Sequence, residues 1–276
     1  MSDVLIAGAG PAGVTLAIEL LRRNVPARLI DIAEAPFEGS RGKGVQPRSL
    51  EIFDMMGVID EVLAVGSLYP FLKIHLGPLS FVRGSLGTHD AATEARPYPN
   101  MLMVPQWRTE EILRSRFEAL GGKIERGAGL ETLEQDTDGV TVTLTNGKKA
   151  KAAYVVGCDG GRSATRKALG LTLHGTSLHE KTMIVADLEI EDLDREFWHV
   201  WPLHRGGPRS LAPLSGTNLF QLQAPERIAA DGLEEGIYRT TGKRVKSVAW
   251  QSRFKHQSRM VDKYQVGRVF LAGDAG

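Results

Sequence analysis

Three glycines near the N-terminus have the spacing of a phosphate-binding loop. The segment GAGPAG places them at Gly8, Gly10 and Gly13, directly after the apolar run VLIA and before apolar residues at helical spacing. In such a loop the first glycine permits a tight turn, the second lets a pyrophosphate approach the backbone, and the third lets helix and strand pack closely. The helix would begin with Pro11 and Ala12, and its first free amides would face the anion. The loop therefore predicts a site for the diphosphate of a dinucleotide.

An acidic residue follows at the distance expected for a ribose contact. Asp31 lies roughly 20 residues after Gly13, near the end of a second apolar run. A carboxylate there accepts hydrogen bonds from ribose hydroxyls and disfavours a 2′-phosphate. An ordinary glycine turn with a solvated aspartate is the alternative, but strand, glycine turn, helix and strand form the βαβ context that the motif needs. Residues 4–31 are therefore predicted to bind the ADP half of a dinucleotide, either NAD or FAD.

The elements that must position this loop predict an α/β domain. Helical spacing of apolar residues predicts helices over 11–24, 48–56, 109–120 and 161–169. Short apolar runs predict buried parallel strands over 4–7, 27–32 and 268–272. From Val140 to Leu144 apolar residues alternate with threonines, and Asn146 and Gly147 are the residue types of a tight type I′ hairpin. A Rossmann-like α/β fold follows from this order.

A second region reads differently, because strand patterns follow one another without clear helices between them. The predicted strands are 71–76, 183–190, 197–202, 219–224 and 245–254. They predict a mainly antiparallel β domain that interrupts the nucleotide-binding domain. We assign residues 1–70, 101–178 and 264–276 to the discontinuous nucleotide-binding domain, and 71–100 and 179–263 to the inserted domain, which would form the substrate wall.

Composition narrows the class of protein. The 34 basic and 33 acidic side chains almost cancel, which gives no general attraction to nucleic acid or to an anionic membrane. The single cysteine, Cys158, excludes an internal disulfide framework and a cysteine-based metal cluster, and we predict no metal site. The N-terminus shows no signal-peptide pattern, and no apolar run reaches the roughly 18 residues of a membrane span. A cytoplasmic location, without membrane or nucleic-acid partners, is the expectation.

Three further segments resemble the signature segments of one family. They are RGKGVQPRSLEIFDMMG at 41–57, YVVGCDGGRSATRKALG at 154–170 and GRVFLAGDAG at 267–276. With the glycine loop they resemble, in order and spacing, the class A flavoprotein monooxygenases, the aromatic hydroxylase type. The resemblance implies a GR2-type FAD-binding domain, FAD as cofactor, NADPH or NADH as reductant, and a flavin C4a-hydroperoxide formed with O2. Its substrate would be a small aromatic, phenolic or polyketide-like molecule.

The resemblance also implies roles for individual residues. The glycine loop would hold the FAD pyrophosphate and Asp31 the adenosine ribose. Arg41 would lie along the flavin and diphosphate, and Gln106 would bond FAD between the ribityl chain and the ring. The family's DG motif corresponds to Asp159 and Gly160, which would support FAD and nicotinamide binding. Its GD motif corresponds to Gly273 and Asp274, whose aspartate would bond the ribityl chain.

Several of these residues have a simpler interpretation that stays open. Arg41 could be a surface arginine in a polar loop, Gln106 an ordinary residue at a helix entry, and Asp159 a cap of the helix that follows it. The cluster of His199, Trp201 and His204 could line a phenolic substrate pocket, or could be a strand with an exposed basic turn. No residue is identified as a catalytic base.

The chain departs from the family pattern at its end. The family continues after the GD motif into H-x-x-P-P-x-G-G-Q-G and a long helix, and this sequence stops at Gly276. We therefore expect a truncated form with an uncovered apolar strand, weakened FAD affinity and weak or absent hydroxylation. Two other functions remain as alternatives: a related flavoprotein reductase, and a non-catalytic nucleotide-binding remnant.

Overall fold

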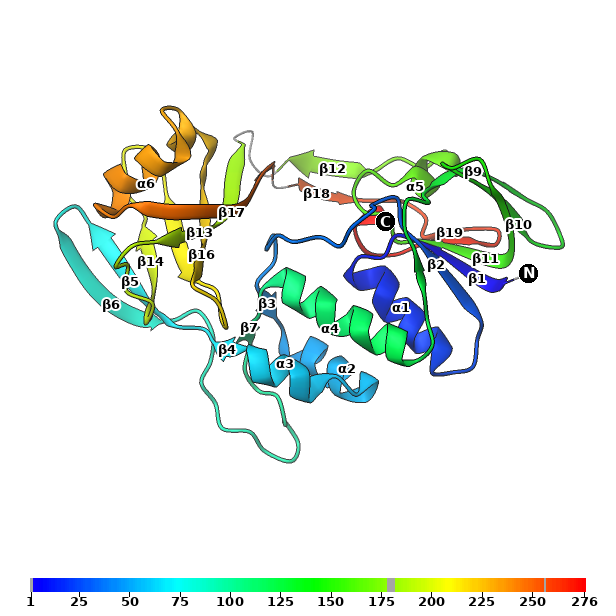
Figure 1. Cartoon of the computed structure of the whole chain (residues 1–276), viewed down its shortest axis with the longest axis horizontal. Helices are drawn as coiled ribbons and strands as arrows, with labels where there is room; N and C mark the ends of the chain where they lie inside the picture. The colour runs from blue at the N-terminus through cyan, green and yellow to red at the C-terminus, as the bar shows by residue number, and fades with distance from the viewer. Residues whose placement is uncertain (1, 178–181, 256) are drawn as a thin grey trace. The chain divides into compact units, whose positions relative to one another are not determined.

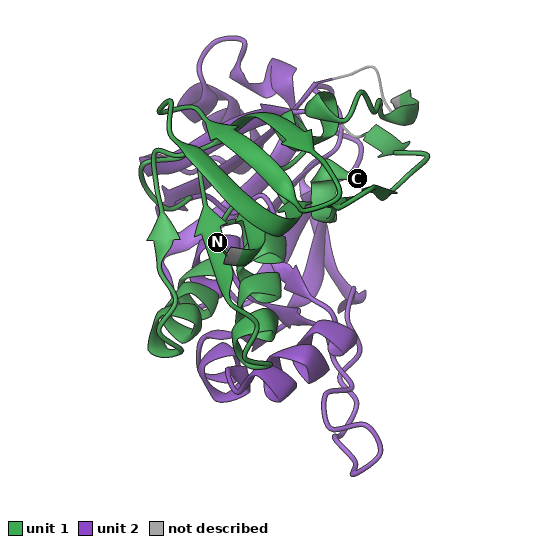
Figure 2. Ribbon diagram, turned by 90° about the vertical axis from the view of Figure 1, so that its right-hand side faces the viewer, with its two compact units in different colours: residues 1–37, 110–176, 257–276 green, residues 38–109, 177–256 purple. Residues whose placement is uncertain are grey.

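A computed structural model describes residues 2–177, 182–255 and 257–276 (Figure 1). The chain divides into two compact units, which Figure 2 shows in different colours. Unit 1 comprises Met1–Phe37, Glu110–Thr176 and Gln257–Gly276, and unit 2 comprises Glu38–Thr109 and Ser177–His256.

The units differ in three places from the domains that the sequence predicts; one is that residues 257–263, assigned above to the inserted domain, cluster with unit 1. Residues 38–70 and 101–109, assigned above to the nucleotide-binding domain, cluster with unit 2. They do so because the loop before β3 contacts the β16 and β17 strands of unit 2 through Ser40 and Gly39. The predicted boundary between residues 178 and 179 lies outside the described residues.

Unit 1 is built on a mostly parallel sheet with the order β19-β20-β11-β1-β2-β8 (Figure 1). The strands are β1 Ser2–Ala7, β2 Ala27–Ile30, β8 Ile124–Glu125, β11 Lys149–Gly157, β19 Gln265–Val266 and β20 Val269–Leu271. β1 pairs in parallel with both β11 and β2, and β20 pairs in parallel with β11. This is the α/β arrangement that the sequence predicts. Strands β9 Leu130–Gln135 and β10 Val140–Leu144 extend the sheet in antiparallel fashion from β11.

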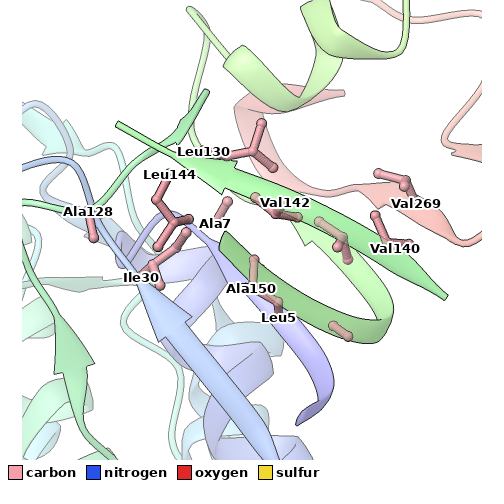
Figure 3. Packing of buried hydrophobic residues seen from close by; sticks show 12 residues of the cluster. Leu5, Ala7, Ile30, Ala128, Leu130, Val140, Val142, Leu144, Ala150 and Val269 are labelled. Atoms are coloured by element: carbon pink, nitrogen blue, oxygen red, sulfur yellow. The ribbon is translucent and has the colours of Figure 1, made fainter. Parts of the chain in front are cut away.

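A buried apolar cluster joins the parallel strands to this antiparallel extension (Figure 3). Leu5 comes from β1, Ile30 from β2 and Val269 from β20, and all three are fully buried. Val142 and Leu144 of β10 meet them, and the threonines between are only partly buried, as the alternation predicts. Burial of this apolar cluster stabilises the sheet. The sheet in turn holds in place the end of β1, where the glycine loop begins.

The hairpin between β10 and β11 is not the predicted type I′ turn. That turn needs positive φ at both central residues. Gly147 has φ 78°, whereas Asn146 is not among the positive-φ residues of the described chain. The loop has four residues, Thr145 to Lys148. A loop of this length reverses the chain with a single left-handed residue, Gly147. The Asn146 side chain instead accepts a hydrogen bond of 3.1 Å from the Lys148 amide.

The helices of the two units are α1 Pro11–Leu21, α2 Pro47–Met56, α3 Ile59–Val65, α4 Gln106–Ala119, α5 Ala164–Ala168 and α6 Leu233–Thr241. α1 ends earlier than predicted, because the chain turns at Asn24, which has φ 57°. α2 ends at Gly57 in the left-handed conformation, as predicted. The sequence did not predict α6, since Gly236 breaks its pattern. A Cβ there would lie 1.9 Å from the Ile228 carbonyl oxygen, so glycine is required for packing rather than for a turn.

Unit 2 contains a seven-stranded sheet with the order β17-β13-β16-β15-β14-β5-β6 (Figure 1). Its strands are β5 Phe71–Leu76, β6 Leu79–Ser85, β13 Met183–Ile190, β14 Phe197–Trp201, β15 Arg209–Pro213, β16 Leu219–Pro225 and β17 Val245–Phe254. All neighbours pair in antiparallel fashion except β14 and β5, which are parallel. The mainly antiparallel character is confirmed. β15 was not predicted, because it is short and lies between proline and glycine residues.

Smaller sheets complete the fold. In unit 2, β7 Leu102–Met103 pairs with β3 Gly44–Val45 and β4 Ser67–Leu68, which ties the loop around residue 44 to the entry of α4. β12 His174–Ser177 pairs with β18 Gln257–Met260. Within the described ranges no helix is long and apolar enough to cross a membrane, and no three histidine, cysteine or acidic side chains are grouped as metal ligands.

Candidate functional site

Three of the sequence motifs begin at one edge of the parallel sheet. In the strand register, Ala7 of β1 is the partner of Gly157 of β11, and Gly157 is the partner of Leu271 of β20. The glycine loop, the DG motif and the GD motif follow these residues directly, at the carboxyl ends of adjacent parallel strands. Ligands of open α/β sheets bind at this edge. The structure thus brings together motifs that are far apart in sequence.

Two glycines of the loop, Gly8 and Gly13, have the packing roles that their spacing predicts. Gly8 has φ 105°, and a Cβ there would lie 2.3 Å from the Cys158 carbonyl oxygen. A Cβ on Gly13 would lie 1.9 Å from the Gly8 carbonyl oxygen. Gly10 differs, because its φ is −75° and its Cβ would project into open space with no atom within 4 Å. Two glycines are therefore required for packing, and the third leaves a space that a side chain would fill.

The start of α1 supplies donors beside this space. Its N-cap residue is Gly10, which makes no side-chain cap hydrogen bond, and Pro11 occupies the first turn. Pro11 and Ala12 are exposed. The first amides of the helix have no partner within the helix and carry partial positive charge, so they suit an anion. The space at Gly10 and these amides fit the diphosphate of FAD.

The third motif lies against the same helix start. A Cβ on Gly273 would lie 3.0 Å from the Ala12 Cβ, and Gly273 has φ 62°, which favours glycine. The short helix Gly273–Ala275 follows, and Asp274 within it is exposed. The GD motif is therefore next to the glycine loop, with its carboxylate accessible to a ligand.

Asp31 binds backbone within the glycine loop. Its Oδ2 accepts a hydrogen bond of 2.6 Å from the Ala9 amide, and its Oδ1 accepts one of 2.7 Å from the Ala33 amide. The carboxylate thus holds the loop to the end of β2. Each carboxylate oxygen retains a further lone pair, so the predicted ribose contact is compatible with these bonds.

Asp159 makes the helix-capping contacts that the sequence left open as an alternative. Its carboxylate accepts hydrogen bonds from the Thr165 amide at 2.9 Å, from the Thr165 hydroxyl at 3.0 Å and from the Ser163 hydroxyl. Gly160 beside it has φ 76° and open space where a Cβ would be. The DG motif therefore combines an aspartate that orders the start of α5 with a glycine that leaves room for a ligand.

Sequence reasoning missed Arg166, the residue that links two of the motifs. Arg166 is 6% exposed, and its guanidinium donates to the Ala275 carbonyl at 3.0 Å and to the Gly161 carbonyl at 2.8 Å. It therefore ties the turn after β11 to the turn after β20. One feature of the sequence could have indicated Arg166. It lies three residues after the N-cap Ser163, and residues three apart share a helix face.

Cys158 lies between these motifs and is buried and free. Burial, and secondarily the Asp159 carboxylate, raise the pKa of its thiol to about 12. A thiol nucleophile needs the thiolate form, so Cys158 acts as a small packing residue.

In unit 2, the structure places Gln106 beside the loop that carries Arg41. The Gln106 side-chain oxygen accepts a hydrogen bond of 2.9 Å from the Gly42 amide, and the Gln106 amide donates to the Gly42 carbonyl at 3.1 Å. Gln106 begins α4, and Arg41 is exposed. The two residues that the family resemblance assigns to the flavin are thus neighbours within one unit.

The histidine and tryptophan cluster is only partly accessible. His199 is 2% exposed and donates from Nε2 to the Asp194 carbonyl oxygen at 2.7 Å. Its Nδ1 then accepts from His75 Nε2 at 3.0 Å, because a carbonyl oxygen can only accept. The His75 ring stacks on Trp201 with centroids 4.4 Å apart. His75, Trp201 and His204 line a cavity of about 340 Å³, whereas His199 does not.

This histidine pair predicts an acid-sensitive fold. Burial, followed by the charges of His199 and Lys73, lowers the pKa of His75 from 6.5 to about 4. The folded state therefore prefers neutral His75, and this stabilisation is complete above pH 6.5 and is lost as the pH falls towards 4. Melting temperatures measured across that range should show a smaller acid-induced decrease for His75→Asn than for the natural chain. Exposed His174→Asn is the control, and an unchanged slope in His75→Asn would contradict the prediction.

Comparison with known proteins agrees with this arrangement. The FAD binding domain family matches residues 1–276. A flavin-dependent monooxygenase of Mycobacteroides abscessus is 37% identical over 99% of this chain and 61% of its own length. A rifampicin monooxygenase of Streptomyces venezuelae is 34% identical over 100% of this chain and 58% of its own length.

The fold is also that of a solved monooxygenase. The flavin-dependent monooxygenase PieE, solved in complex with FAD and substrate, superposes with a TM-score of 0.85 at 24% identity. The alignment covers 99% of this chain and 53% of PieE. This chain therefore spans between half and two thirds of the length of these proteins. On the family match, the identities and the motif geometry together, the chain belongs to the FAD-binding family of flavoprotein monooxygenases of the aromatic hydroxylase type.

Proposed function

We propose that the chain is the FAD-binding part of a monooxygenase that uses NADPH or NADH and O2 to hydroxylate an aromatic, phenolic or polyketide-like substrate. The observation that carries the proposal is the meeting of the glycine loop, the DG turn and the GD turn at one sheet edge, with open space at Gly10 and Gly160. Such a space next to uncapped helix amides suits a diphosphate.

The residues divide the work of holding the cofactor. In the proposal, the first amides of α1 bind the diphosphate, Asp31 orders the loop and accepts from the adenosine ribose, and Asp274 accepts from the ribityl chain. Arg41 and Gln106, which share the Gly42 loop, bind the flavin side. A guanidinium suits that position, because it donates in a fixed fork to phosphate or carbonyl oxygens.

Bound FAD would supply the redox chemistry that protein side chains lack, namely acceptance of hydride and activation of O2. The contribution of the chain is binding, orientation and exclusion of water. The strands of unit 2 offer aromatic and apolar side chains for the substrate. Support for a bulky aromatic substrate comes from the relative that is named a rifampicin monooxygenase.

A spectroscopic titration tests the proposal. The purified chain is mixed with FAD, and binding is followed by quenching of flavin fluorescence; one FAD per chain is expected. NADPH or NADH is then added with a panel of phenols under labelled oxygen. We expect one phenol to accelerate the bleaching of the flavin. The same phenol should then contain a labelled oxygen atom. Binding of FAD without any product would favour a nucleotide-binding role, and no binding of FAD would overturn the proposal.

A further inference from the structure

A buried polar cluster in unit 2 lies beneath the loop that carries Arg41. Lys43 of this loop is 7% exposed and its ammonium donates to the side-chain oxygen of Gln221 on β16. The Gln221 amide in turn donates to the Ser40 carbonyl. Asp187 of β13 is the register partner of Gln221 and is 1% exposed. The loop is therefore attached to the sheet through polar groups.

The cluster also contains every buried side-chain polar atom of the described residues that lacks a hydrogen-bond partner. These atoms are Ser40 Oγ, both carboxylate oxygens of Asp187 and Trp198 Nε1. Two of these residues interact with Lys43: its ammonium lies 4.5 Å from the centroid of the Trp198 ring, and its charge lowers the pKa of Asp187. Unpaired buried polar groups destabilise a fold and are rare.

Burial shifts the pKa values of Lys43 and Asp187 towards neutral pH. Burial lowers the pKa of Lys43 to about 8, and the charge of Asp187 opposes this decrease. Burial raises the pKa of Asp187 to about 6, and the nearby polar groups of Ser40 and then the charge of Lys43 oppose this increase. Among the described residues, no third charged side chain contributes to the pKa shift of either group. Both groups are therefore charged together only between about pH 6 and pH 8.

The same loop also makes hydrogen bonds to residues at the start of α4 and just before it. The Val104 amide donates to the Lys43 carbonyl at 2.8 Å, and Gly42 exchanges two hydrogen bonds with Gln106. Gly39 lies so close to Trp250 that a Cβ would be 2.2 Å from the indole ring. The loop is therefore held both by these contacts and by the hydrogen bonds of Lys43 and Ser40 to Gln221.

We infer that Lys43, Asp187 and Gln221 are positioning residues, whose buried charged cluster holds the loop from Ser40 to Gly44 in the conformation in which Arg41 and Gln106 bind FAD. The inference deepens the proposed function and rests on it. It accounts for the polar atoms left without partners, because a charged cluster specifies one loop geometry at the expense of stability.

The pH dependence of FAD affinity tests the inference. In the natural chain, affinity should be highest between about pH 6 and pH 8, falling at lower pH as Asp187 is protonated and at higher pH as Lys43 loses its proton. Asp187→Asn should abolish the decrease on the acid side, and Lys43→Arg the decrease on the alkaline side. The double variant Lys43→Met with Asp187→Asn should bind FAD about tenfold more weakly, with no pH dependence over this range. Its melting temperature should be equal to or higher than that of the natural chain.

A matched surface pair is the control. Lys246 lies 3.3 Å from Glu189, which is also on β13, and both are partly exposed. Lys246→Met with Glu189→Gln makes the same charge change and should leave both FAD affinity and its pH profile unaltered. If the buried double variant keeps the natural affinity and profile, or loses affinity only through a lower melting temperature, the inference is overturned.

A readout without FAD separates this inference from the proposed function. If the natural chain does not bind FAD, the proposed function fails, and amide hydrogen exchange then tests the positioning role. Exchange in residues 40–44 should be at least about tenfold faster in the buried double variant than in the surface double variant. Equal exchange in the two variants would overturn the inference.

Discussion

Gly13→Ala should destabilise the fold and abolish FAD binding, with a loss of about 2–4 kcal/mol in the free energy of unfolding. The added Cβ would lie 1.9 Å from the Gly8 carbonyl oxygen, with Cys158 Cβ at 3.2 Å. Backbone at the first turn of α1 cannot move aside without breaking the contact between the helix and β1. Denaturant unfolding of the variant, followed by circular dichroism, gives the loss directly.

Gly10→Val is the matched variant, because the same loop there has room for a side chain. With φ −75° and no atom within 4 Å of its Cβ, the change should alter the free energy of unfolding by less than about 1 kcal/mol. It should nevertheless weaken FAD binding at least roughly 100-fold, because the side chain fills the space for the diphosphate. If Gly10→Val binds FAD like the natural chain, the diphosphate does not lie at this loop.

Arg166→Met is expected to give the second large effect, a loss of about 2–3 kcal/mol of stability. The guanidinium is almost fully buried and bonds two carbonyls, those of Gly161 and Ala275, which would be left without this donor. FAD affinity should fall as well, because the DG and GD turns would no longer be held together. Thermal unfolding and FAD titration of the same preparation measure both effects.

Lys167→Met is the control for this prediction, because it removes the same charge from the neighbouring, exposed position of α5. It should change stability by no more than about 0.5 kcal/mol. Equal effects of the two substitutions would show that the net charge of α5 matters rather than the link between the turns. Arg166→Lys should restore stability only in part, since a lysine cannot reproduce the two divergent guanidinium bonds.

Much of the nucleotide site could be predicted from local sequence. The glycine spacing, the following helix and Asp31 occur within one continuous segment, and the structure places them as that pattern requires. Five of the seven strands in the large sheet of unit 2 were predicted for the same reason, since their patterns are local. α6 and β15 were missed where local signals conflict with packing: Gly236 looks like a helix breaker, yet it is there for close contact with Ile228.

The predicted roles of individual residues depended on less local information. Asp159 was assigned both a ligand role and a capping role from sequence, and its bonds to Ser163 and Thr165 are those of the cap. His199 looked like a pocket residue because it stands beside Trp201 in sequence. Residues i and i+2 of a strand lie on one face, so His199 and Trp201 do share a face, but His199 is 2% exposed and packs among His75 and Phe220, so it does not line the cavity.

By itself, the sequence predicted a dinucleotide site on an α/β unit and a second, mainly antiparallel unit, because periodicity and glycine spacing act over short distances. Only the tertiary structure decided which groups support that site. Arg166 and Ala275 are 109 residues apart, and Lys43 and Gln221 are 178 residues apart. No local pattern marks such pairs, since their contact arises from the order of strands in a sheet and from the burial of polar groups beneath a loop.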